Sequence, residues 1–145
     1  MHGTVTARSA SEIARFFVWK ADEEDELLSH LKLQKLLYYT QGFHLAMFDG
    51  DLFSEDVLHW KHGPVVREVW DEYKRYGGSG IPHDGEGPQI DDESTELLEE
   101  IWRVYGQFSA WRLREMSHQT DPWSSTVENA VISKESMRKF FLTQL

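Results

Sequence analysis

Apolar side chains recur every three to four residues in several separate segments of the chain, which is the spacing of an α-helix that buries one face. The first such helix is predicted over residues 9–22, where Ser9 and Glu12 have the spacing of a capping box. Another is predicted over 64–76, because Pro64 is tolerated in the first turn of a helix. Three more are predicted further along: one that ends at Gly106, one over 110–118 after Ser109, and a last one after Ser133.

The segment 29–48 differs from the others because apolar side chains cover nearly its whole circumference. A helix that is apolar all round is buried by its neighbours, so we predict that this one lies at the centre of the fold. Gln34 and Gln41 lie seven residues apart on one stripe of this helix, and Lys35 and Gly42 lie on the next stripe. The two glutamines either face an opening or bond internally to adjoining loops, and Gly42 allows another element to approach closely.

Turn-forming residues separate the helices. The acidic turn 49–51 precedes a segment with extended character, and one short hairpin is expected near 50–61. The glycine-rich segment 77–91 is predicted to be a long loop, either a linker or a mobile lid. The expected fold is therefore mainly α: a single compact domain of about six helices around the central one.

Composition narrows the function classes. The chain has 145 residues, no cysteine and a net charge of −10, and both halves are acidic. The absence of cysteine excludes disulfides, thiolate metal sites and cysteine nucleophiles. No apolar run is long enough to span a bilayer, and residues 1–8 have no signal-peptide pattern, so a soluble cytoplasmic protein without a membrane partner is expected. The acidic charge disfavours nucleic acid as the main partner and leaves a basic protein partner open.

Two alternative functions involve chemistry or DNA. His59 and His62 lie three residues apart, and together with His118 and Asp121 they make a small metal-dependent hydrolase one alternative. The chain has neither an HExxH motif nor a GxSxG motif, and the histidine spacing by itself is weak. The second alternative is a DNA-binding regulator, which the net charge disfavours.

Two loop motifs combine tryptophan, proline and polar side chains: residues 60–66 and residues 117–123. This composition is typical of binding hot spots, although it is equally compatible with tryptophans that fill the core. We predict that the two motifs converge on one groove, with the glutamine stripe of the central helix as its floor. The predicted partner-binding residues are Gln34, Gln41, Trp60, Lys61, His62, Pro64, His118, Asp121, Pro122 and Trp123.

The same motifs carry a family resemblance. The chain resembles the Panacea antitoxin domain in order and spacing over a core of about residues 9–142. The resemblance is carried by the run 31–45, the pair 52–53, the segments 60–66 and 69–70, the pair 105–106, and finally 117–118 with 121–123. Older names for this family are phage-associated GepA-like and SocA-like proteins. Two positions depart from the family pattern, because Ser117 replaces a usual threonine and His62 a usual tyrosine.

The resemblance implies a single, mostly helical antitoxin domain over residues 1–145. It implies no catalytic activity, no cofactor and no metal. The implied partner is a cognate protein toxin, encoded by a neighbouring gene and neutralised by direct binding. A protease that receives the bound toxin is a further implied partner.

Overall fold

The computed structural model describes residues 8–83 and 85–145. Residues 1–7, for which the sequence predicts no secretion signal, and residue 84 of the predicted loop lie outside this range. The elements in chain order are α1 (Ala10–Glu23), α2 (His30–Phe48), β1 (Val57–Trp60), β2 (Gly63–Val65), α3 (Arg67–Tyr73), the 3-10 helix η1 (Lys74–Tyr76), α4 (Asp92–Tyr105), α5 (Ala110–His118), α6 (Asp121–Ser124), β3 (Val131–Ile132) and α7 (Lys134–Leu142). The described residues are 58% helical, so the predicted mainly α fold is confirmed.

Helix starts follow local capping signals. The Ser9 side chain accepts a hydrogen bond from the backbone of Glu12, and the Glu12 side chain bonds back, which completes the predicted capping box of α1. The predicted caps Ser109 and Ser133 accept backbone hydrogen bonds at the starts of α5 and α7 in the same way. Ser29 does so for α2. Helix α6 is an additional helix of a single turn with Pro122 at its start, and it begins within the segment 117–123 that the sequence predicts as a loop motif.

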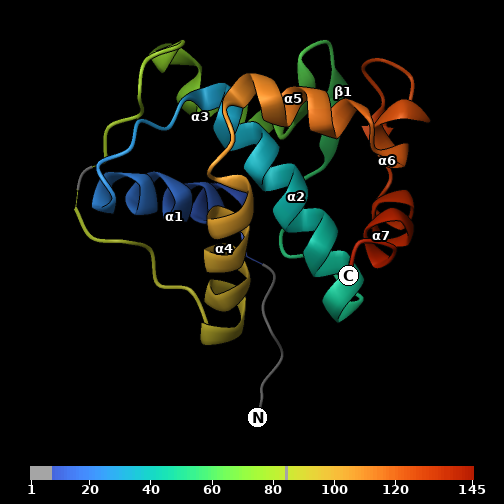
Figure 1. The fold of residues 1–145 in the computed structure, drawn as a ribbon, viewed down its shortest axis with the longest axis horizontal. Helices are drawn as coiled ribbons and strands as arrows, with labels where there is room; N and C mark the ends of the chain where they lie inside the picture. Colours follow the sequence, from blue (N-terminus) through green and yellow to red (C-terminus); the bar gives the residue numbers. More distant parts are fainter. Residues whose placement is uncertain (1–7, 84) are drawn as a thin grey trace.

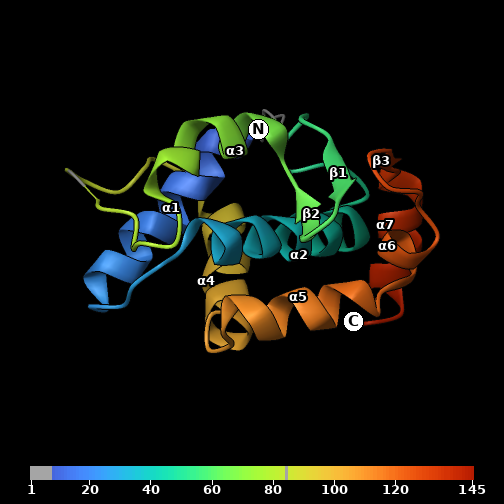
Figure 2. The ribbon, with the colours of Figure 1, turned by 90° about the horizontal axis from the view of Figure 1, so that it is seen from above.

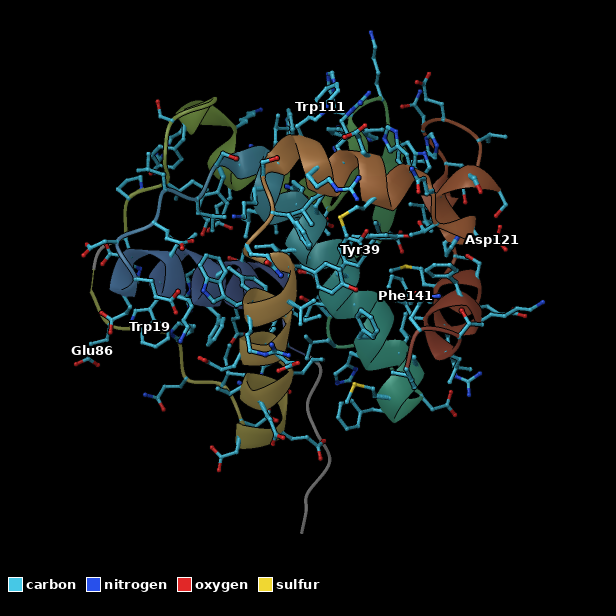
Figure 3. The ribbon with its side chains drawn as sticks, viewed as in Figure 1. Trp19, Tyr39, Glu86, Trp111, Asp121 and Phe141 are labelled. Atoms are coloured by element: carbon cyan, nitrogen blue, oxygen red, sulfur yellow. The ribbon has the colours of Figure 1, made fainter. Side chains whose placement is uncertain are left out.

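Helix α2 is the centre of the molecule, as predicted. Helices α1, α3, α4, α5 and α7 and strand β2 all pack against it, and it crosses the middle of the ribbon in both views (Figures 1 and 2). Gly42 allows α7 to pack closely against α2, because a Cβ atom there would overlap the ring of Phe141 on α7. Figure 3 shows Phe141 directed from α7 towards α2. Buried aromatic and aliphatic side chains around α2 form one continuous core cluster.

The small sheet has the strand order β2-β1-β3, with both pairings antiparallel. The hairpin of β1 and β2 therefore lies over residues 57–65, later than the predicted 50–61. Pro64 belongs to the edge strand β2 and not to a helix start, because α3 begins only at Arg67. An edge strand tolerates proline, whose missing N–H leaves no gap in the ladder.

The segment between η1 and α4 has no helix or strand among its described residues 77–83 and 85–91, in agreement with the predicted loop. It packs against the first part of the chain. The Ile81 N–H donates to the Leu28 carbonyl at 2.9 Å, and Gly87 lies against the Trp19 ring. Among the residues that the structure describes, no helix has the length and apolarity needed to cross a membrane.

Candidate functional site

The two glutamines of the predicted stripe are fully buried and bonded to backbone. Gln34 accepts a hydrogen bond from the Val66 N–H at 2.8 Å. Gln41 accepts one from the Leu52 N–H at 2.8 Å and donates one to the Phe53 carbonyl at 2.7 Å. Both side chains thus satisfy backbone groups of adjoining segments that have no partner in a helix or strand. This is the internal role that the sequence left as one of two alternatives. The prediction that these glutamines form the polar floor of an open groove is wrong, because neither side chain reaches solvent.

Strand β1 separates the two predicted tryptophan motifs. Neighbouring residues of a strand point to opposite faces, so His59 and Trp60 face different parts of the molecule. Trp60 meets Trp70 of α3 edge to face, with ring centroids 5.3 Å apart. His59 instead stacks on Trp123 at 3.4 Å. The late motif therefore meets β1 at His59, which lies just outside the motif 60–66, and the two tryptophans pack against different partners.

Trp123 is enclosed between two histidine rings. The His59 and His118 rings stack on the indole at centroid distances of 3.4 Å and 4.4 Å, with interplanar angles of 13° and 4°. Trp123 is 7% exposed. Burial lowers the pKa of His118, and the nearby cations Arg114 and Lys35 lower it further. In this histidine–tryptophan sandwich of His59, Trp123 and His118, the imidazole of His118 is therefore neutral at neutral pH.

This arrangement corrects the metal-dependent alternative. The Trp123 ring separates His59 from His118, so their nitrogens cannot share one ion. Within residues 8–83 and 85–145, no three histidine, aspartate or glutamate side chains are placed to hold a metal. The predicted set of His59, His62, His118 and Asp121 is not a ligand cluster.

A pocket of about 410 Å³ lies where α2, α5 and the turn between β1 and β2 meet. Figure 2 shows α2 running between α5 and this hairpin. The lining residues are Leu31, Lys35, His62, Ala110, Trp111 and Arg114. Only His62 of these belongs to the predicted binding set.

Lys35 forms the inner wall of this pocket, and it is 1% exposed. Burial, together with the charge of Arg114, lowers the pKa of Lys35 to about 8. The chain of Lys35 passes Gly63 so closely that a Cβ atom there would lie 2.7 Å from Cε and 3.1 Å from Nζ. Gly63 also has a φ of +124°, which favours glycine. The absence of a side chain at Gly63 therefore leaves the space through which the Lys35 side chain extends to the pocket.

A corner of hydrogen bonds fixes α5 and α6 against α2. The Thr120 hydroxyl donates to the Ser117 carbonyl at 2.6 Å, so Tyr38 must donate its own hydroxyl hydrogen to Thr120, also at 2.6 Å. The Ser117 hydroxyl donates to the Arg114 carbonyl at 2.9 Å. The late motif is therefore anchored to the central helix, and this anchoring positions Arg114 at the pocket.

The predicted binding residues differ in how accessible they are. Pro64 and Pro122 are buried, as are both glutamines and Trp123. Trp60 and His118 are partly exposed. Lys61, His62 and Asp121 are exposed. Sequence reasoning missed Lys35, Trp111 and Arg114, although a lysine on a helix that is otherwise apolar all round was a usable signal for the first.

A larger pocket of about 660 Å³ lies between α2 and α4 near the C-terminal residues. Its lining is mainly apolar and includes Phe43, Met47 and Tyr105, with Glu96 and Glu100 also present. None of the predicted binding residues lines it, and neither loop motif, 60–66 or 117–123, contributes to it.

The family model described as "Antitoxin SocA-like, Panacea domain" matches residues 33–124. The chain belongs to this family. A relative named "Antitoxin SocA", from Caulobacter vibrioides (strain NA1000 / CB15N), is 30% identical over 128 residues, which cover 79% of this chain and 68% of that protein. No solved structure matches the chain. The resemblance to the Panacea antitoxin domain is thus confirmed, and the SocA-like segment contains Lys35, Gly63, Arg114 and the histidine–tryptophan sandwich.

Proposed function

We propose that this chain is an antitoxin that neutralises a protein toxin, encoded by a neighbouring gene, by binding it directly. The observation that carries this proposal is the match of the antitoxin domain to residues 33–124. Membership of an antitoxin family supports an antitoxin role and suggests a protein without catalytic activity. A partner must recognise exposed side chains, and the elements of the family motifs supply them around the 410 Å³ pocket.

The proposed contact surface comprises the turn between β1 and β2 and the outer side of α5. Lys61 and His62 are exposed in that turn, and Trp111 of α5 is 63% exposed at the pocket (Figure 3). Tryptophan is enriched among residues that dominate binding energy, because it buries a large rigid surface. Asp121 is exposed at the start of α6 and extends the same surface along the α5–α6 corner. The buried members of the predicted set support this surface and do not touch the partner.

Co-expression tests the proposal most directly. The product of the adjacent open reading frame is induced with and without this chain, and growth is followed. The purified pair is then examined by size-exclusion chromatography and calorimetry. We expect restored growth and a stable complex. Absence of both toxicity and complex formation for either neighbouring gene product would refute the proposed function.

A pair of variants locates the surface. Trp111→Ala should weaken toxin binding and growth rescue while leaving the melting temperature nearly unchanged, because the side chain is mostly exposed. Phe48→Ala is the matched control, because Phe48 is also an exposed aromatic side chain but lies at the 660 Å³ pocket. Loss of binding in Phe48→Ala alone would move the contact surface to that second pocket.

The protease route is a separate part of the proposal. If the chain delivers the toxin to a protease, the toxin's half-life in cells should shorten when the antitoxin is present. Direct neutralisation requires only the purified pair, so an assay of toxin activity without any protease separates the two modes. Inhibition in that assay together with an unchanged half-life would reject the delivery role.

A further inference from the structure

The 410 Å³ pocket contains positive charge that nothing in the described structure neutralises. The eight ion pairs of the described residues involve neither Lys35 nor Arg114. Lys35 is only 1% exposed, and the buried Nε of Arg114 has no hydrogen-bond partner within the described part of the chain. The ionisable groups that shift the pKa of Lys35 and of His118 are all basic. Arg114 acts on Lys35, and Arg114, Lys35 and His59 act on His118. This local excess is notable in a chain whose net charge is −10.

The positive charge persists at neutral pH. With a pKa of about 8, Lys35 keeps its proton at pH 7, and the guanidinium of Arg114 is always charged. A buried cation without a counter-charge is unfavourable, and two neighbouring cations raise the cost. An anion that enters the pocket removes this cost, and the pocket is open enough to admit one because an exposed His62 and Trp111 form its rim.

The walls of the pocket favour an anion attached to apolar groups. The Arg114 guanidinium lies over the Trp111 ring, with Cζ 4.9 Å from the centroid, which fixes the direction of its donors. Leu31, Ala110 and Trp111 add apolar surface around the two cations. A free polyanion such as a nucleic acid would be repelled by the acidic remainder of the chain, whereas one carboxylate on a folded partner would not.

We propose that this pocket binds the carboxylate of an aspartate or glutamate side chain of the toxin. Lys35 and Arg114 pair with the carboxylate, and an apolar neighbour of that residue packs on Leu31 and Trp111. This inference rests on the proposed antitoxin function and names the chemistry that its surface recognises. Charge-assisted hydrogen bonds of this kind are short and directional, so they fix the register of the complex as well as its strength.

The first test examines the pocket without the toxin. In a chain labelled with 13C-lysine, the Lys35 Cε resonance, identified by its loss in Lys35→Met, is followed during titration with sodium acetate against sodium chloride at constant ionic strength. Acetate should shift this resonance and raise the pKa of Lys35, while the exposed Lys139 of α7 should respond equally to both salts. No difference between the salts would overturn the proposal. A response to inorganic phosphate but not to acetate would also overturn it, in favour of a phosphate site.

The second test uses the toxin complex. Lys35→Met keeps the volume of the side chain and removes the charge, so we expect toxin binding to weaken at least about tenfold with an equal or higher melting temperature. Lys139→Met is the matched control and should bind like the wild type. If Lys35→Met does not fold, Arg114→Gln provides the same measurement at a partly exposed position.

The outcomes separate the two proposals. If the wild-type chain forms no complex with the toxin, the antitoxin function fails, and the assignment of the carboxylate to a toxin fails with it. If the wild-type chain binds the toxin and both Lys35→Met and Arg114→Gln bind equally well, only the carboxylate pocket is overturned.

Discussion

Replacement of Gln41 by leucine should destabilise the fold without acting on a binding surface. The Gln41 side chain is fully buried on α2 and serves the backbone of the segment 52–53, which has no regular strand partner of its own. Leucine has a similar size but cannot bond, so the Leu52 N–H and the Phe53 carbonyl lose their partners in the core. The same segment receives a hydrogen bond from the Arg8 N–H at 2.8 Å, so the start of α1 is affected as well.

The magnitude follows from these two backbone groups. An unsatisfied buried donor or acceptor costs about 1–3 kcal/mol, so loss of both partners by Gln41→Leu should lower the free energy of unfolding by about 2–6 kcal/mol. For a chain of this size, where 1 kcal/mol shifts the melting temperature by about 3 °C, that corresponds to a fall of about 6–18 °C. Leucine adds some apolar burial, which offsets part of the loss and favours the lower half of the range.

Urea denaturation followed by circular dichroism measures this effect. The midpoint should fall while the slope with urea stays the same, because the surface exposed on unfolding is nearly unchanged. Gln107→Leu is the matched control, since Gln107 is exposed and should change stability by less than about 0.5 kcal/mol. A Gln41→Leu variant with wild-type stability and lost partner binding would refute the structural role and restore Gln41 as a contact residue.

Three further perturbations test separate parts of the fold. Acidification should destabilise the protein through His30, because burial lowers its pKa to about 4 and its Nε2 must accept the Gln34 amide at 3.0 Å. The unfolded chain then binds more protons between pH 6.5 and 4, so His30 should remove about 2 kcal/mol by pH 5. His30→Gln, which keeps an acceptor, should flatten this part of the stability profile, and an unchanged profile would contradict the account. Gly42→Ala should cost about 1–3 kcal/mol in thermal unfolding because its Cβ overlaps the Phe141 ring, and adding Phe141→Leu should recover part of the loss; no recovery would place the strain elsewhere. Ser9→Ala should cost about 1 kcal/mol by removing the cap of α1, and a change below the error of urea melts would show that Glu12 alone suffices.

Local signals in the sequence determined the helices of this protein. Capping serines, helix-breaking glycines and apolar periodicity act within one or two turns, so the starts of α1, α5 and α7 and the end of α4 at Gly106 were predictable. The apolar circumference of residues 29–48 likewise identified the central helix, since only a surrounded helix can bury every face. Family membership also followed from motif order along the chain.

Only the tertiary structure decided what the motifs do. The pairing of β1 places His59 and Trp60 on opposite faces of the strand. The sequence did not define where this strand begins, so it could not show which residue faces which side. The anchoring bond from Tyr38 to Thr120 spans 82 positions, and the contact of Lys35 with Gly63 also joins distant segments. A charged residue on an apolar helix is visible in sequence, but whether it meets a carboxylate, water or an empty pocket depends on which elements pack beside it. In this chain α5 brings Arg114 rather than an acidic group to Lys35, so the balance of charge at the site is a property of the assembled fold.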